Sequence, residues 1–400
     1  MDMQRLATAS RLANIDAFHV MELAKQAAAL ERAGRHIVHM GIGEPDFTAA
    51  EPVVRAAEAA MRRGVTQYTG ALGIQPLREA IAGYYKTAYG LDIPARRVIV
   101  TAGASGALLL ACAVLVEIGA EVLMPDPSYP CNRHFVAAFD GAARMIPSGP
   151  AERFQLTAAQ VEANWGEQTR GVLLASPSNP TGTSIEPGEL RRIHEVVTRR
   201  GGITLIDEIY LGLSYDDAFG QSALGIDDQI ISVNSFSKYF SMTGWRLGWL
   251  VVPEALVPVI ERLAQNLFIC ASTVSQYAAL ACFEPESIAE YERRRAEFKA
   301  RRDWFIPQLQ ALGLEVPVVP DGAFYAWADC SAFGEKLGIA NSWDFAFEAM
   351  KKAHVAVTPG RDFGSAETAR FVRFSTASSM AHLQESVERL RAWAGAAVPA

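Results

Sequence analysis

Residues 97–124, RVIVTAGASGALLLACAVLVEIGAEVLM, hold one complete unit of the pattern that decides the fold. The apolar residues 98–101 predict a strand, the stretch 105–116 predicts a helix, and residues 121–124 predict a second strand. A short turn of small residues joins the first strand to the helix. A strand, a helix and a strand in this order are typical of a parallel sheet that is covered by helices.

The same alternation continues along the chain to residue 252. Further strands are predicted at 143–146, 172–175, 203–206, 230–234 and 247–252, and further helices at 157–164, 187–199 and 254–265. With the two strands of the first unit, the predicted strands number seven. We therefore expect an α/β fold with one large, mostly parallel seven-stranded sheet whose crossover connections are helices.

The sequence patterns at both ends of the chain predict a smaller α+β region. A long charged helix at 287–312 is expected to bridge the two regions. The remaining predicted elements are a helix at 16–33 and a strand at 37–40 before the sheet, and strands at 323–328, 353–357 and 369–375 with helices at 343–352 and 382–396 after it. We expect a large domain of residues 46–288 and a small domain made of residues 1–45 and 289–400.

Composition and charge exclude several classes of protein. The chain has 400 residues, of which 50% are hydrophobic and 20% charged, and this is the balance of a globular protein. A net charge of −7 leaves no basic surplus to neutralise phosphates, so we expect no nucleic-acid partner. The longest apolar stretch, 106–116, is far shorter than the roughly 18–20 residues that cross a bilayer, so we expect no membrane partner.

The thiols and imidazoles indicate a reduced, metal-free protein. The five cysteines form no C-x-x-C pair and are widely scattered: Cys112, Cys131, Cys270, Cys282 and Cys330. The histidines show no ligand spacing, so no metal is expected. Residues 1–12 have no apolar core or cleavage site of a secretory signal. These features predict a cytoplasmic protein.

The turn Gly103-Ala-Ser105-Gly106 opens a predicted helix directly after a strand. Free N–H groups and the positive end of the helix dipole make such a turn able to bind an anion. A tight packing turn with no ligand is the alternative interpretation. The turn also lacks only the last glycine of the hydrolase nucleophile elbow G-x-S-x-G, so a serine hydrolase is a rival function.

Lys238 lies in the segment Ser235-Phe-Ser-Lys-Tyr-Phe-Ser-Met-Thr-Gly-Trp-Arg-Leu-Gly248, between two predicted strands in apolar surroundings. Burial lowers the pKa of a lysine amine, which suits the formation of a Schiff base. An ordinary surface lysine is the alternative. Ser235-x-x-Lys238 also matches the S-x-x-K of penicillin-binding serine enzymes, but the S-D-N and K-T-G tripeptides of those enzymes do not occur in the sequence.

Polar residues follow two other predicted strands. Asp207-Glu-Ile-Tyr210 follows the strand 203–206, and Asn179 follows the strand 172–175. The carboxyl ends of parallel strands are where ligands bind in such sheets. Asp207 therefore either caps a turn or holds a cation in a protected site. Asn179 either belongs to a simple turn or presents its amide at the same edge.

Taken together, the order and spacing of these segments resemble a known family. The matching segments are Gly43-Glu-Pro-Asp46, Tyr68, Gly103-Ala-Ser105, Tyr129, Asn179-Pro-Thr-Gly182, Asp207-x-x-Tyr210, Ser235-x-Ser-Lys238 with Arg246 eight residues on, and Phe371-x-Arg373-x-Ser375. From about residue 13 to the C-terminal helix, the chain resembles the class I and II aminotransferases of pyridoxal-phosphate fold type I. The resemblance implies an enzyme of amino-acid metabolism that binds pyridoxal 5'-phosphate. Such an enzyme moves the amino group of an L-amino acid to a 2-oxo acid, here expected to be 2-oxoglutarate, by a ping-pong mechanism.

The resemblance also implies a role for each matching residue. Lys238 would bind the cofactor covalently and transfer the substrate proton, and Asp207 would pair with the ring nitrogen. Tyr210 and Asn179 would hydrogen-bond the phenolic oxygen, and Tyr129 would stack on the ring. Gly103, Ala104, Ser105, Ser235, Ser237 and Arg246 would surround the phosphate. Arg373, with Gly43 and Asn179 nearby, would bind the substrate α-carboxylate. Tyr68 would reach the phosphate of the neighbouring subunit, which implies a homodimer with composite active sites.

Two further functions and the substrate stay open at this level. A C–S β-lyase or a related synthase uses the same cofactor chemistry. A non-catalytic cofactor-sensing regulator would need a DNA-binding extension, for which the sequence before the resemblance leaves no room. Some aspartate-specific relatives place a lysine where this chain has Ser105, which argues against aspartate. Phe18, in a segment that often lines the substrate pocket, favours a neutral or aromatic side chain.

Overall fold

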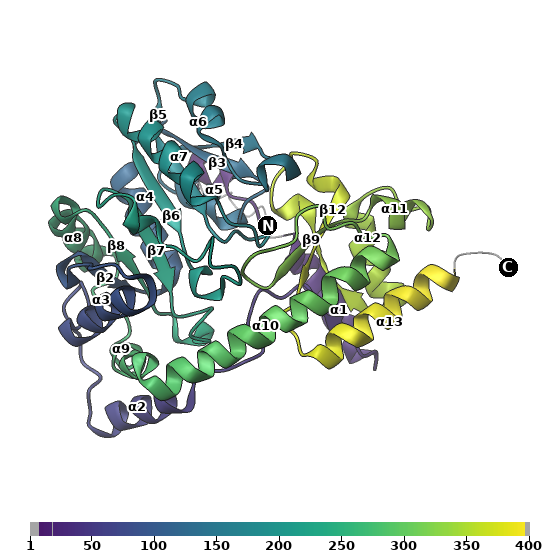
Figure 1. Ribbon diagram of the computed structural model, residues 1–400, viewed down its shortest axis with the longest axis horizontal. Coiled ribbons are helices and arrows are strands. Elements are labelled where there is room, and N and C mark those ends of the chain that lie inside the picture. Colours follow the sequence, from purple (N-terminus) through teal and green to yellow (C-terminus); the bar gives the residue numbers. More distant parts are fainter. Residues whose placement is uncertain (1–7, 18, 397–400) are drawn as a thin grey trace, which may run out of the picture.

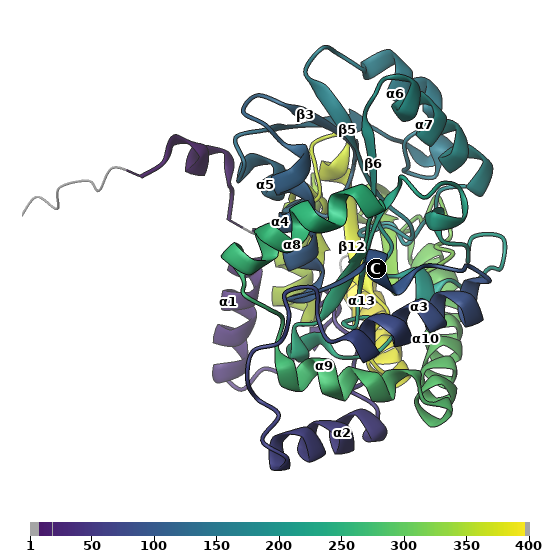
Figure 2. The same cartoon turned by 90° about the vertical axis from the view of Figure 1, so that its left-hand side faces the viewer.

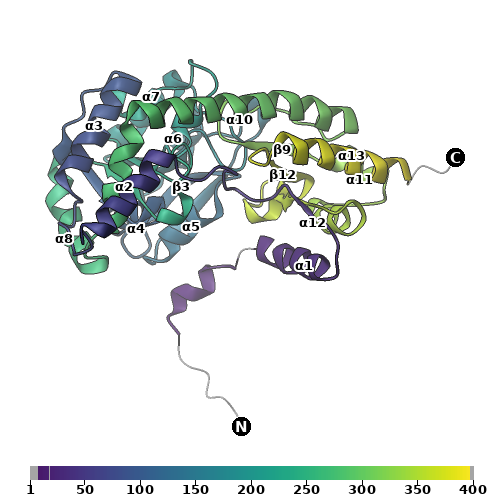
Figure 3. The same ribbon diagram turned by 90° about the horizontal axis from the view of Figure 1, so that it is seen from below.

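The computed structural model describes residues 8–17 and 19–396 of the chain. Figure 1 shows a large sheet with its helices at one end and a smaller region at the other. The smaller region contains both the first helix and the last, so both ends of the chain contribute to it. Helix α10 (Pro285–Leu312) runs along both regions, as Figure 3 shows.

The large sheet has seven strands in the order β2-β8-β7-β6-β5-β3-β4. Its strands are β2 (Val98–Thr101), β3 (Glu121–Asp126), β4 (Ala142–Pro147), β5 (Thr169–Ala175), β6 (Ile203–Asp207), β7 (Ile231–Ser235) and β8 (Gly248–Val251). Only β8 runs antiparallel to its neighbours β2 and β7. The predicted seven-stranded, mostly parallel sheet is confirmed.

The strand register brings the predicted site residues to one edge of this sheet. Asp207, the last residue of β6, pairs with Ala175 on one side and Val233 on the other. Gly248 of β8 pairs with both Thr101 and Ser235. The turn after β2 therefore lies beside the loop that carries Lys238, although the two are far apart in sequence.

Helices cover both faces of the sheet. In Figure 2, α4, α5 and α8 lie on one side of the strands, and α6 and α7 lie on the other. Neighbouring residues of one strand face these two layers in turn, since Leu205 packs in the core under α4 and Ile206 packs in the core under α7. The bounds are α4 (Gly103–Leu115), α5 (Pro130–Ala137), α6 (Ala158–Asn164), α7 (Pro187–Arg199) and α8 (Val257–Leu267).

Several helices differ from the sequence prediction. The segment predicted as one helix at 254–265 is a 3-10 turn at Glu254–Leu256 followed by α8, with Pro258 in the first turn of the α-helix. Helices α2 (Glu51–Arg62), α3 (Gln75–Tyr89), α5 and α9 (Thr273–Ala279) have no counterpart in the prediction. A proline in the first turn and an amphipathic pattern are signals for α2 and α3, whereas α5 and α9 are too short for a clear period.

The smaller region contains a three-stranded antiparallel sheet in the order β11-β12-β9. Its elements are β9 (Tyr325–Asp329), β11 (Thr358–Pro359), β12 (Phe371–Ser375), α11 (Ser331–Glu335), α12 (Ser342–Glu348), α13 (Met380–Ala396), α1 (Val20–Arg32) and the parallel pair β1 (Val38–His39) and β10 (Val355–Ala356). The strand predicted at 353–357 is therefore short, because the chain pairs with β1 before Val357 and with β12 after it.

Helix α1 begins later than the predicted residue 16. The carboxylate of Asp362 accepts hydrogen bonds from the backbone N–H groups of His19 and Val20, at 3.1 and 2.8 Å. This carboxylate satisfies first-turn N–H groups that have no partner within a helix, so the helix begins at Val20.

Helix α10 packs on two hydrophobic cores. Tyr291 and Phe298 in its first half belong to a core with residues of the large sheet, such as Trp249. Phe305 and Leu309 in its second half belong to a core with residues of the smaller region. One rigid helix thereby fixes the position of the small sheet relative to the large one.

Residues 8–17 and 19–396 include no helix that is both long and apolar enough to cross a membrane. Within the same ranges, no three or more His, Cys, Asp or Glu side chains are grouped to hold a metal ion. All five cysteines are free thiols.

Candidate active site

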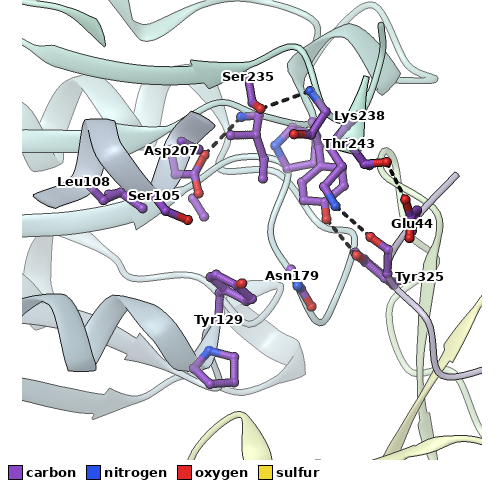
Figure 4. Close-up of a pocket in the computed structure, with 18 of the residues that line it drawn as sticks. Glu44, Ser105, Leu108, Tyr129, Asn179, Asp207, Ser235, Lys238, Thr243 and Tyr325 are labelled. Atoms are coloured by element: carbon purple, nitrogen blue, oxygen red, sulfur yellow. Dashed lines mark hydrogen bonds between the residues drawn. The ribbon is translucent and has the colours of Figure 1, made fainter. Parts of the chain in front are cut away.

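A cavity of about 500 Å³ lies at the carboxyl edge of the large sheet, where the small region meets it. Figure 4 shows the side chains that face it. Every predicted site residue except Gly103 and Tyr68 lines this cavity: Gly43, Ala104, Ser105, Tyr129, Asn179, Asp207, Tyr210, Ser235, Ser237, Lys238, Arg246 and Arg373. The structure thus gathers residues from 43 to 373 around one space.

Lys238 supplies an amine inside the cavity. It follows β7 in the loop to β8, and its Nζ donates a hydrogen bond to the carbonyl oxygen of Gly43 at 2.6 Å. Burial, together with the positive charge of Arg373, lowers the pKa of Lys238 to about 8. A larger fraction of this amine is therefore neutral near pH 7 than for an exposed lysine, and the neutral amine is the nucleophile.

Asp207 supplies a buried carboxylate at the end of β6. Its Oδ1 accepts a hydrogen bond from the backbone N–H of Ile209 at 3.1 Å. Burial raises the pKa of Asp207 to about 7, although the charge of Lys238 opposes this shift. A cation placed against this carboxylate would restore its ionised form, because opposite charges attract strongly where water is excluded.

The N-terminus of α4 and Arg246 form a cradle for an anion. Gly103 has a φ of +73°, and a Cβ atom there would lie 2.8 Å from Nη2 of Arg246. Arg246 donates from Nη1 to the carbonyl oxygen of Thr243 at 3.0 Å, and in the described part of the chain it pairs with no carboxylate. A guanidinium against a helix N-terminus fits a phosphate. Gly103 itself does not line the cavity, but its missing side chain leaves the space that Arg246 occupies.

Ser235, near this cradle, has a structural role in its own turn. The Ser235 hydroxyl accepts a hydrogen bond from the N–H of Ser237 at 3.0 Å and donates one to the carbonyl oxygen of Leu247 at 3.3 Å. Ser235 therefore shapes the turn that carries Lys238 as well as lining the cavity.

Arg373 lies across the cavity, in the middle strand of the small sheet. It donates from Nη1 to Oδ1 of Asn179 at 2.7 Å and from Nη2 to the carbonyl oxygen of Gly41 at 2.6 Å. Its guanidinium carbon lies 4.4 Å from the ring centre of Tyr325 and 4.9 Å from that of Phe363. No carboxylate among residues 8–17 and 19–396 pairs with it. A buried, oriented and unneutralised guanidinium is suited to bind a carboxylate ligand.

The sequence prediction missed several residues of the site. Glu44, Thr243, Tyr325, Asp362 and Phe363 also line the cavity. Glu44 lies inside the Gly-Glu-Pro-Asp segment and hydrogen-bonds Thr243, so its motif was a signal. No local pattern distinguishes Tyr325, Asp362 or Phe363, because each reaches the cavity only through the position of the small region.

Besides Gly103, one predicted residue is not part of this cavity as the single chain forms it. Tyr68 is 79% exposed and does not line the cavity of its own chain. Phe18 lies outside the described residues.

Comparisons with known proteins agree with this geometry. The family described as "Aminotransferase class I and II" matches residues 35–390. A valine–pyruvate aminotransferase of Mycobacterium tuberculosis is 38% identical over 95% of this chain and 97% of its own length. A (5-formylfuran-3-yl)methyl phosphate transaminase of Methanocaldococcus jannaschii is 35% identical over 95% of this chain and 98% of its own. The crystal structure of an aminotransferase from Mycobacterium tuberculosis superposes with a TM-score of 0.92 at 38% identity and covers 98% of this chain and 99% of that one.

The fold and the cavity therefore define a pyridoxal-phosphate-dependent enzyme of fold type I. The chain belongs to the class I and II aminotransferases. It is a transaminase whose substrates are amino acids and 2-oxo acids.

Proposed function

We propose that the enzyme transfers the amino group of an L-amino acid to 2-oxoglutarate by a ping-pong mechanism, with the cavity described above as its active site. One observation carries the residue roles: the amine of Lys238, the carboxylate of Asp207 and the guanidinium of Arg373 face the same cavity. These are the groups needed to hold a carbonyl cofactor, its ring nitrogen and a substrate carboxylate.

The cofactor fits the residues that are present. Arg246 and the first N–H groups of α4 would hold its phosphate, and Asp207 would pair with its ring nitrogen. Tyr129 would stack on the ring, while Tyr210 and Asn179 would hydrogen-bond the phenolic oxygen. When bound, pyridoxal phosphate supplies an electron-withdrawing ring that stabilises negative charge at the substrate Cα.

Lys238 then acts on the substrate proton. Its Nζ is the amine of the cavity with a lowered pKa, and it removes the proton from Cα as a general base. Arg373 binds the α-carboxylate and so holds Cα in reach of Lys238. Asn179 keeps the guanidinium in place through its Oδ1.

We further propose a homodimer whose sites are shared. The exposure of Tyr68 and its absence from the cavity of its own chain support a role in the partner's site. The free thiols support a cytoplasmic location. We also propose a division into residues 46–288 and a small domain of residues 1–45 and 289–400. The two hydrophobic cores on α10 support two domains, while Tyr291 and Phe298 pack in the core of the large sheet.

A substrate screen tests this function. The purified holoenzyme is given each of the twenty amino acids with 2-oxoglutarate or pyruvate, and the new amino acid and new oxo acid are both measured. We expect transfer with parallel-line kinetics, and 2-oxoglutarate as the better acceptor. Transfer to pyruvate but not to 2-oxoglutarate would contradict the proposal that 2-oxoglutarate is the acceptor. Steady release of pyruvate and ammonia without an acceptor would indicate a lyase instead.

A further inference from the structure

Tyr325 lines the cavity, but the proposed function assigns it no role. It is the first residue of β9, pairs with Ser375 in the small sheet and is 1% exposed. Figure 4 shows its side chain at the edge of the cavity, on the side of Glu44. Its hydroxyl and its ring contact two different parts of the site.

The hydroxyl of Tyr325 contacts the side of the site that would hold the cofactor. It lies 2.6 Å from the hydroxyl of Tyr210, which is a short hydrogen bond between two buried groups. A Cβ atom added at Gly43 would lie 2.5 Å from the same hydroxyl oxygen. The Tyr325 hydroxyl therefore fills the space above Gly43, whose carbonyl oxygen holds Nζ of Lys238.

The ring of Tyr325 contacts the side that would hold the substrate. The guanidinium carbon of Arg373 lies 4.4 Å from the ring centre, within the range of a cation–π interaction. Phe363 is a second ring near the same guanidinium, at 4.9 Å. With the hydrogen bonds to Asn179 and Gly41, these rings leave the fork of Arg373 little freedom to turn.

We propose that Tyr325 is a positioning residue that couples Arg373 to Tyr210. Its ring holds the guanidinium that receives the substrate carboxylate, and its hydroxyl donates a hydrogen bond to the oxygen of Tyr210. Each hydroxyl has one proton, so if Tyr210 donates to the cofactor's phenolic oxygen, the proton between the two tyrosines must come from Tyr325. A donor of this kind strengthens the next hydrogen bond in the chain. This inference rests on the proposed roles of Tyr210 and Arg373.

The sign of the expected effect follows from charge. A hydrogen bond donated to the phenolic oxygen of the cofactor stabilises negative charge on that oxygen. The oxygen then attracts the proton at Nζ of Lys238 less strongly, so the proton leaves at a lower pH. Loss of the donor raises the pH at which this proton leaves. The other charged groups that face Nζ of Lys238 are Arg373, Glu44, Asp207 and Arg246. Tyr129 and Arg373 also face the two tyrosines, and Tyr325→Phe leaves all of these side chains in place.

The first experiment titrates the visible absorption of the holoenzyme against pH in Tyr210→Phe, Tyr325→Phe and the double variant. We expect the apparent pKa to rise most in Tyr210→Phe and by about half a unit in Tyr325→Phe. The double variant should match Tyr210→Phe alone, because the Tyr325 hydroxyl acts only through Tyr210. Tyr84→Phe is the control, since it removes a hydroxyl that pairs with Tyr89 away from this cavity.

The second experiment measures how tightly the holoenzyme binds 3-methylbutanoate, a carboxylate without an amino group. Tyr325→Phe keeps the ring and should bind within about twofold of the wild type, whereas Tyr325→Leu should bind about tenfold more weakly. Circular dichroism of both variants checks that they fold. If the leucine variant does not fold, the absorption titration of Tyr325→Phe still decides the proposal.

Each outcome separates this inference from the proposed function. A shift in Tyr210→Phe without one in Tyr325→Phe, or additive shifts in the double variant, would overturn the coupling and leave the role of Tyr210 intact. No shift in either variant would overturn the role of Tyr210 itself. Equal 3-methylbutanoate affinity in a folded Tyr325→Leu would show that the ring does not position Arg373.

Discussion

Oδ1 of Asn179 accepts a hydrogen bond from Nη1 of Arg373 at 2.7 Å, between residues that are 194 positions apart in the sequence. Asn179 follows β5 of the large sheet, and Arg373 lies in β12 of the small one. This contact joins the proposed cofactor side of the cavity to the proposed substrate side. A ligand that binds both residues would therefore also hold the two regions together.

Arg373→Lys tests the carboxylate role. A lysine has one rotatable ammonium and cannot reproduce the fork that contacts both Asn179 and a carboxylate. We expect kcat/KM to fall by roughly two to three orders of magnitude for every amino acid, because all of them share the α-carboxylate. Arg370→Lys, at an exposed arginine just before the same strand, should change little. A loss confined to dicarboxylic substrates would show that Arg373 reads the side chain instead.

Lys238→Ala tests the covalent role. Reduction of the holoenzyme with borohydride should fix the pyridoxyl group on the peptide that contains Lys238, as mass spectrometry can show. The alanine variant should lose transamination, because no other lysine lines the cavity in the part of the chain that the structure describes. Lys86→Ala, at an exposed lysine, should keep both properties. Labelling of any other lysine would refute the assignment.

Asp207→Asn should stabilise the cofactor-free protein above neutral pH. The pKa of Asp207 is raised from 3.8 to about 7 by burial, so the folded state binds more protons than the unfolded state between these values. Stability of the wild type is therefore lost as the pH rises through this window, while asparagine cannot ionise. We expect equal melting temperatures near pH 4 and a variant about 2–8 °C more stable at pH 8. Asp217→Asn, at an exposed position, is the control, and a variant less stable at pH 8 would contradict the burial argument.

Gly103→Ala should weaken cofactor binding. The new methyl group would lie 2.8 Å from Nη2 of Arg246, so the guanidinium must move away from the helix N-terminus. We expect the affinity for pyridoxal phosphate, measured by fluorescence titration of the apoenzyme, to fall about tenfold or more. Gly64→Ala introduces the same type of strained backbone, at φ +70°, with no atom within 4 Å, and separates strain from the clash. Equal affinity in both variants would show that Arg246 does not hold the phosphate.

Subunit mixing tests the shared site. Lys238→Ala chains and Tyr68→Ala chains should each be inactive or strongly impaired, but a mixed dimer has one site with both lesions and one with neither. After exchange, activity should recover to at most about a quarter of the wild type per total site, since half the dimers are mixed and half their sites are intact. Lys238→Ala mixed with Arg373→Ala should not recover, because each lesion stays in its own chain's cavity. A lack of recovery by the first pair despite proven exchange would exclude the shared site.

The sequence by itself determines the reactive groups of the cavity. Lys238, Asp207 and Asn179 each follow a predicted strand, and all three lie at the predicted edge of the sheet. Local patterns carry this information because strand periodicity and turn residues depend on neighbours in sequence, and a parallel sheet gathers the carboxyl ends of its strands on one side. The same reasoning places Arg373 in a strand, although it does not reveal the partner of its guanidinium.

Only the tertiary structure decides which residues meet across the cavity. The start of α1 depends on Asp362, 342 residues from Val20, and the orientation of Arg373 depends on Tyr325 and Phe363. These contacts leave no period or motif in the sequence, because they arise from how one long helix sets the small sheet against the large one. Packing between distant elements therefore determines the geometry of a site whose reactive groups are indicated by local sequence patterns.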